Sequence, residues 1–171
     1  MSTRRKRTPP PGRPGDMFTL MDEMLASPTE PMPADDAASR VAAALHHLER
    51  LATEPAPNVM EWRVCAMVGN FMEVLLELGI AQDPDGLLVD AFAALRAAAE
   101  RNLRAGKTIR LTGPGLVAIR GLIRDFAEIL EQAPHRTIIR AFRETDKRVR
   151  SLDRGGRRPS DYVAQVGLAR S

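Results

Sequence analysis

The residues of this chain that are best placed for chemistry are cations, and they recur along its final third. Steps of 4, 3, 4, 3 and 4 residues separate them, which places their side chains on one side of an α-helix. These six residues are Arg136, Arg140, Arg143, Lys147, Arg150 and Arg154. We call this set the basic stripe. A row of exposed cations attracts an anionic partner, so the stripe predicts anion binding rather than catalysis.

Two further groups of cations accompany the basic stripe. They are Arg4, Arg5, Lys6 and Arg7 near the N-terminus, and Arg157 and Arg158 after the stripe. An exposed basic face beside basic tails is typical of nucleic-acid binding, and arginine and lysine mainly contact the phosphate backbone. The sequence therefore predicts a small nucleic-acid-associated accessory or regulatory protein that binds DNA or RNA. A helix-turn-helix, with its turn at Ala133, Pro134 and His135 and the following helix as the recognition helix, is a weaker interpretation, because such corners are common between helices.

The charges are segregated along the chain, which favours an alternative function. Residues 16–100 carry four basic and fifteen acidic residues, whereas residues 134–171 carry ten basic and four acidic ones. The acidic middle is a counter-surface for the basic stripe, either in this chain or in a second copy. The alternative is therefore a protein–protein interaction module: an adaptor, an inhibitor or a self-associating scaffold.

An apolar, methionine-rich segment supplies the docking residues of this alternative. They are Phe18, Met21, Met24 and Leu25. Methionine side chains adapt to varied partner surfaces, and an amphipathic helix can dock into a groove. The other interpretation of the segment is a short helix that packs on its own domain.

No set of residues has the spacing of a catalytic or cofactor site. His46 and Glu49 are three residues apart, but a two-metal site in a helical bundle needs two Glu-x-x-His pairs and further carboxylates. Cys65 lies in an apolar run without a nearby histidine, which predicts a buried, inert thiol. The glycines of residues 111–115 lack the order of a phosphate loop and mark the start of a helix. We therefore predict a protein that is not an enzyme and binds no cofactor or metal.

The apolar residues recur at helical spacing, and no run alternates as a strand does. The predicted fold is all-α: a single compact bundle of about five helices with a flexible basic tail at each end. The helices are expected at residues 35–54, 58–78, 83–106, 112–133 and 134–154. The second of them is apolar around most of its circumference, so we expect it in the middle of the bundle.

Four segments follow from these patterns. They are a basic Pro/Gly-rich tail at 1–15, a short amphipathic segment and Pro-rich linker at 16–34, the bundle at 35–154, and a basic tail at 155–171. A lone cysteine forms no internal disulfide, and prolines stand where the apolar core of an export signal would be. No apolar run reaches membrane-spanning length. These observations predict a cytoplasmic protein without a membrane partner.

Overall fold

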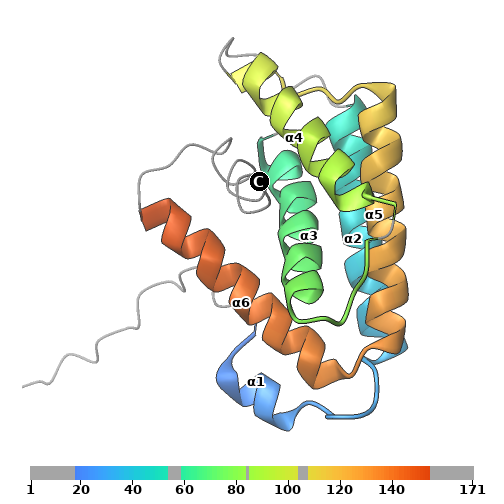
Figure 1. The fold of residues 1–171 in the computed structure, drawn as a ribbon, viewed down its shortest axis with the longest axis vertical. Coiled ribbons are helices and arrows are strands. Elements are labelled where there is room, and N and C mark those ends of the chain that lie inside the picture. Colours follow the sequence, from blue (N-terminus) through green and yellow to red (C-terminus); the bar gives the residue numbers. More distant parts are fainter. Residues whose placement is uncertain (1–17, 54–58, 84, 104–107, 155–171) are drawn as a thin grey trace, which may run out of the picture.

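The computed structural model describes residues 18–53, 59–83, 85–103 and 108–154, and it confirms the all-α prediction for them. Six helices and no strand are present in these ranges (Figure 1). The helices are α1 (Leu20–Leu25), α2 (Ala34–Thr53), α3 (Val59–Glu77), α4 (Leu87–Leu103), α5 (Gly113–Gln132) and α6 (His135–Arg154). The last five correspond to the five predicted helices, although α4 begins later than predicted, and α1 lies in the amphipathic segment. The predicted tails at 1–15 and 155–171 lie outside the described residues.

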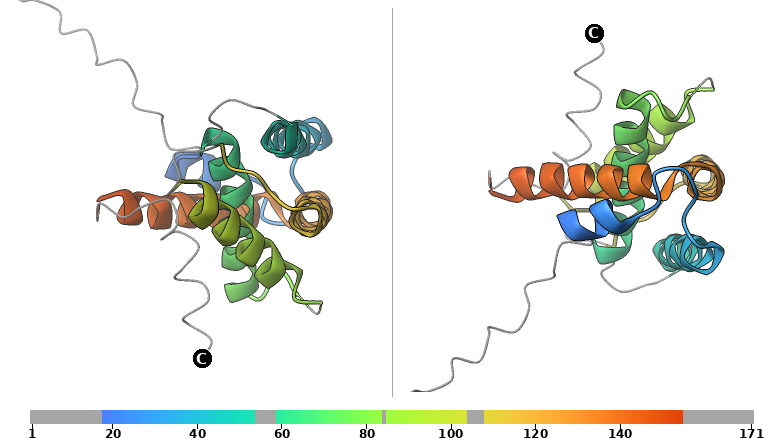
Figure 2. Two further views of the ribbon diagram at one scale, coloured as in Figure 1. Left: turned by 90° about the horizontal axis from the view of Figure 1, so that it is seen from above. Right: turned by 90° about the horizontal axis from the view of Figure 1, so that it is seen from below.

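Helix α3 occupies the middle of the bundle, as its apolar circumference predicts. It contacts α2, α4, α5 and α6, while α5 packs against both α2 and α4. Figure 2 shows α2 and α5 end-on where α6 is seen lengthwise, so α6 crosses that pair steeply. Helix α1 packs against α6. As a result, α6 packs against α3 on one side and against α1 on another.

Aromatic side chains join α3 to its neighbours. The fully buried Phe71 ring stacks on Phe142 of α6 with centroids 4.2 Å apart, and it meets Phe126 of α5 edge-on at 5.4 Å. The buried indole of Trp62 donates a hydrogen bond from Nε1 to the Leu95 carbonyl of α4 at 2.9 Å. The two large rings of α3 therefore contact three helices, α4, α5 and α6, which fits the central position of α3.

Two predicted helix ends are confirmed by their hydrogen bonds. Helix α3 ends before Gly79, which has φ +71°, and the Ile80 N–H donates to the Leu75 carbonyl at 2.9 Å. This is the left-handed glycine cap that the sequence predicts. At the start of α5, the Thr112 hydroxyl accepts a hydrogen bond from the Gly115 N–H at 3.4 Å.

The predicted start of α4 at Asp83 is wrong, because the helix begins at Leu87. Gly86 has φ +68°, a conformation that interrupts a right-handed helix. The Asp83 carboxylate instead accepts a hydrogen bond from the Leu88 N–H at 3.2 Å, so it caps the helix from a distance. The predicted cap Asn58 and the predicted helix end at Gly106 lie outside the described residues.

Candidate functional site

Helix α1 has only six residues, and a capping box stabilises its first turn. The Thr19 N–H donates to Asp22 Oδ2 at 2.7 Å, and the Asp22 N–H donates to Thr19 Oγ1 at 3.2 Å. The hydrogen bonds from Thr19 lower the pKa of the Asp22 carboxyl group. Because so short a helix is unstable alone in water, α1 also depends on contacts with the bundle.

The chain after α1 is tied to the start of α6. The His135 N–H donates to the Glu30 carbonyl at 2.8 Å, and the Arg136 N–H donates to the Ser27 carbonyl at 3.0 Å. The first N–H groups of a helix lack partners within it, so this linker satisfies them. The Arg136 side chain then donates to the carbonyls of Met24 and Ala26, at 3.1 and 3.2 Å. The end of α1 is thereby fixed on α6.

Phe18, one of the predicted docking residues, packs within its own domain. Its half-buried ring lies 5.5 Å from that of Phe142, and the Arg40 guanidinium of α2 lies 4.6 Å from the Phe18 ring centroid. The same guanidinium is 5.2 Å from the Phe142 ring, and its burial lowers the pKa of Arg40. Phe18 therefore anchors α1 to α2 and α6.

The other three predicted docking residues, with Leu20 beside them, face solvent. We call these four residues the α1 ridge; they are Leu20 (58% exposed), Met21 (61%), Met24 (63%) and Leu25 (78%). No residue of α1 is buried, whereas Glu23 turns towards α6 and forms an ion pair with Arg143. A surface helix ordinarily turns its apolar face inward and its charges outward. Helix α1 does the reverse.

The basic stripe divides between contacts within the chain and exposure to solvent. Arg136 and Arg143 hold α1, and Arg150 pairs with Asp146 one turn earlier at 2.7 Å. Arg140 is exposed, and the Lys147 side chain is 76% exposed, with Glu144 at 3.5 Å. The side chain of Arg154 lies outside the described part. So do all of Arg4, Arg5, Lys6, Arg7, Arg157 and Arg158.

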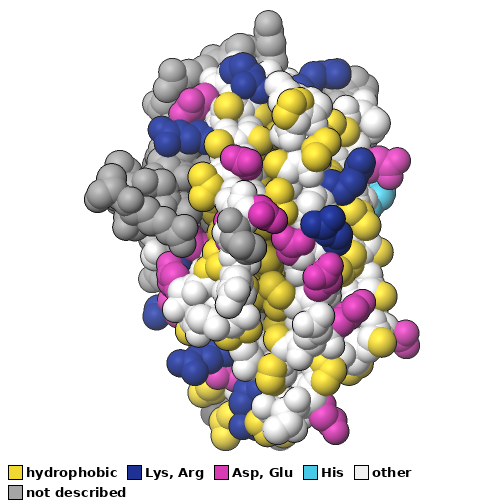
Figure 3. All heavy atoms as spheres, turned by 45° about the vertical axis from the view of Figure 1, so that its right-hand side comes forward, with side chains coloured by type: hydrophobic (Ala, Val, Ile, Leu, Met, Phe, Trp, Pro, Cys, Tyr) yellow, Lys and Arg dark blue, Asp and Glu magenta, His cyan; other side chains and the backbone are white. Residues whose placement is uncertain are grey.

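A charged groove of about 690 Å³ lies between α1, the end of α3 and the stripe side of α6. Arg148 on its wall donates to both carboxylate oxygens of Glu77, at 2.6 and 3.1 Å, and also pairs with Glu144. The hydrogen bond with Glu77 is the main reason that the pKa of Arg148 is raised. Acids and cations thus alternate in this groove. Figure 3 shows a similar mixture of charges on the face that carries α4 and α5.

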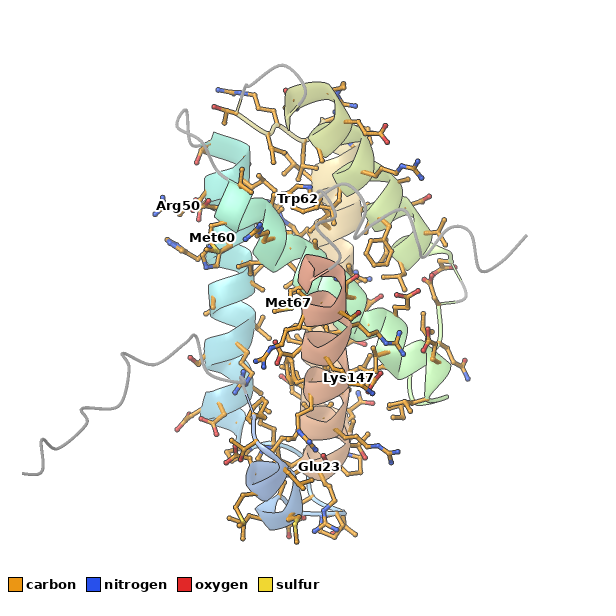
Figure 4. All side chains as sticks on the ribbon, turned by 90° about the vertical axis from the view of Figure 1, so that its left-hand side faces the viewer. Glu23, Arg50, Met60, Trp62, Met67 and Lys147 are labelled. Carbon is orange, nitrogen blue, oxygen red and sulfur yellow. The ribbon has the colours of Figure 1, made fainter. Side chains whose placement is uncertain are left out.

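A second groove, of about 380 Å³, has apolar walls and lies between α2, α3 and α6. Ala43, Val64, Met67 and Val149 are among its lining residues. Figure 4 shows Met67 of α3 in the space between α2 and α6, Met60 farther up beside α2, and α1 at the lower end. We call it the apolar groove. The one sequence feature that relates to this groove is the apolar circumference of α3. The described neighbouring helices leave part of that apolar surface uncovered, but the same pattern of residues also suits a helix that is covered on all sides.

The side chains that were considered as catalytic or metal-binding candidates do not come together in a site within the described residues. Cys65 is 1% exposed, and burial raises its pKa to about 12, so the thiol stays protonated at neutral pH. His46 and Glu49 are both exposed on α2. In the described ranges, no three His, Cys, Asp or Glu side chains gather as metal ligands would. None of the described helices combines the length and the apolar character needed to cross a bilayer.

Comparison with protein-family models, curated proteins and solved structures found no match to this chain.

Proposed function

We propose that this chain is a non-enzymatic protein-interaction module that binds a protein partner through the α1 ridge. The observation that carries the proposal is the exposure of the ridge, 58% to 78% for each of its four side chains. Single exposed apolar residues are normal on protein surfaces, but a contiguous group marks an interaction site. Covering apolar surface lowers the free energy by roughly 25 cal/mol per Å².

The way in which α1 is held supports the proposal. The capping box of Thr19 and Asp22, the carbonyl contacts of Arg136 and the ion pair between Glu23 and Arg143 use none of the ridge side chains. The helix is therefore ordered before any partner arrives. A preorganised surface loses less conformational entropy on binding, which increases its affinity.

Affinity capture with the full chain tests this function. The bait proteins are the unchanged chain, the ridge variant Met21→Glu/Met24→Glu, and Val117→Glu as a control; Val117 is 70% exposed on α5. After nuclease treatment, we expect the unchanged chain and the control to retain a protein that the ridge variant loses. Equal retention by the ridge variant, or capture of nucleic acid alone, would contradict the proposal.

We keep nucleic-acid binding as a second proposal, because Arg140 and Lys147 project from the stripe side of α6 into solvent. Two such cations contribute two phosphate contacts at most, and the tail cations would supply the others. In an anisotropy titration with DNA and RNA, Arg140→Glu/Lys147→Glu should then lower the log–log salt slope by about 2. The absence of binding at low salt would rule out this second function.

A further inference from the structure

The apolar groove exposes part of α3 between α2 and α6. Val64 and Met67 are half-buried on its floor, and Met60 is 61% exposed at one end. A volume of about 380 Å³ is within the range of pockets that hold a ligand or an apolar anchor. Water that contacts such a surface is released when a second apolar surface covers it.

The charges around the apolar groove restrict what can cover it. Arg40 and Arg63 are the charged side chains among its described lining residues, and no acid lines it. They are two of the four basic residues in the acidic stretch 16–100. Arg63 is exposed at the groove, whereas the Arg40 guanidinium lies against the rings of Phe18 and Phe142 and is also attracted by Asp36. A partner that matches this surface presents apolar side chains together with acids.

Helix α1 has both of these properties. Its ridge residues lie on one face, and the exposed Asp22 supplies an acid in the same helix, whereas Glu23 pairs with Arg143 of its own chain. An amphipathic helix that lies in an apolar groove uses side chains at this spacing as anchors. Within one chain, however, α1 is fixed on α6 by Arg136 and Arg143, and no ridge residue lines the groove. The matching helix therefore has to come from another chain.

We propose that the apolar groove receives the α1 ridge of a second copy of this chain, and that the groove of the second copy receives the ridge of the first. The proposal rests on the proposed function and names its partner. Two identical contacts related by a two-fold axis close at a dimer. Figure 4 shows α1 and the groove from the same side of the molecule, an arrangement that lets two facing copies make both contacts.

Sedimentation velocity on the full chain over a range of concentrations tests the dimer. The ridge variant is Met21→Glu/Met24→Glu, and the groove variant is Ala43→Glu, at an exposed lining position of α2. Each should raise the dimer Kd by about thirtyfold or more, because a central apolar anchor becomes a charge. The controls Val117→Glu and Ala42→Glu change exposed residues that line neither surface, and they should leave the Kd unchanged.

Mixing the two variants separates a lost contact from a lost fold. A mixed dimer has one intact contact, the ridge of the Ala43→Glu chain in the groove of the ridge variant. We therefore expect the mixture to associate more tightly than either variant alone, with unchanged circular dichroism for all chains. A dimer that survives in the ridge variant, or a mixture that does not associate, overturns the proposal.

The outcome for the dimer is separable from the outcome for the proposed function. If the unchanged chain is monomeric but the ridge variant still loses a captured protein, the dimer is wrong and the interaction function stands. The groove then belongs to that other partner or to residues 155–171 of the same chain. If neither association nor capture depends on the ridge, both proposals are wrong.

Discussion

Helix α6 separates two grooves of opposite character. On its stripe side, Arg143, Arg148 and Arg150 pair with Glu23, Glu77 and Asp146. On its other side, Phe142 and Val149 line the apolar groove, whose charged lining residues are both arginines. The first surface combines cations with their own counter-charges, whereas the second has apolar walls and no acid among its described lining residues.

This difference shows where binding free energy is still available. Partly exposed ion pairs contribute about 0 to 1 kcal/mol each, and a partner that competes for their charges must first break them. A partner that binds an apolar surface breaks no existing ion pair, because it displaces only water from that surface. The stripe side of α6 therefore serves to hold α1 in place, and the apolar surfaces are the better candidates for a partner.

The strongest test of this contrast changes Phe142, the ring that α6 contributes to the core. Phe142→Ala removes the stack on Phe71 and should lower the free energy of unfolding by about 3–5 kcal/mol, as for other buried aromatic residues. The control Val149→Ala, at a half-buried groove position, should cost about 1 kcal/mol. Urea unfolding measures both. Equal losses would mean that Val149 is covered as fully as Phe142.

A second test uses the buried thiol beside the apolar groove. Burial raises the pKa of Cys65 to about 12 from an ordinary value of 9.0, so folding favours the neutral thiol. Its contribution to stability is complete below pH 9 and is lost as the pH rises from 9 towards 12, by up to about 1.4 kcal/mol per pH unit. The measurement is the free energy of unfolding in urea at several pH values, and subtracting the values of Cys65→Ala from those of the unchanged chain isolates this loss. A difference that does not change with pH would show that water reaches the thiol.

Most of the fold could be predicted from the sequence, because its signals are local. The spacing of apolar residues placed five helices, and Gly79 and Thr112 marked their ends correctly. The sequence predicts the start of α4 too early, because an aspartate before a proline is typical of a helix start. Only the left-handed conformation of Gly86 shows that the helix begins later.

The partners of the charged residues could not be predicted, because they are distant in sequence. Arg143 and Glu23 are 120 residues apart, and Arg148 and Glu77 are 71 apart. Helical spacing places Arg143 on a face of α6, but it does not indicate that α1 covers that face. The exposed ridge was expected only as one of two interpretations, since the same residues suit a helix that buries its apolar side.

A third test breaks the attachment of α1 on the stripe side. Glu23→Gln and Arg143→Met should each lower stability by about 1 kcal/mol, and the double variant should lose less than the sum. Because the pair joins α1 to α6, amide hydrogen exchange in residues 20–25 should accelerate more than in α3. Strictly additive losses would contradict a direct interaction between the two side chains.

The smallest expected effect concerns the ion pair between Arg148 and Glu77, whose side chains are 37% and 50% exposed. Glu77→Gln should lower the free energy of unfolding by about 0.2–1 kcal/mol at low salt. At 1 M salt the Debye length falls to about 3 Å, so the difference from the unchanged chain should nearly vanish. Glu128→Gln, at an exposed position of α5, is the matched control in urea unfolding at both salt concentrations. A larger decrease in the free energy of unfolding that persists at high salt would show that the charged groove excludes water. The contrast between the two sides of α6 would then be weaker than the exposures of these side chains indicate.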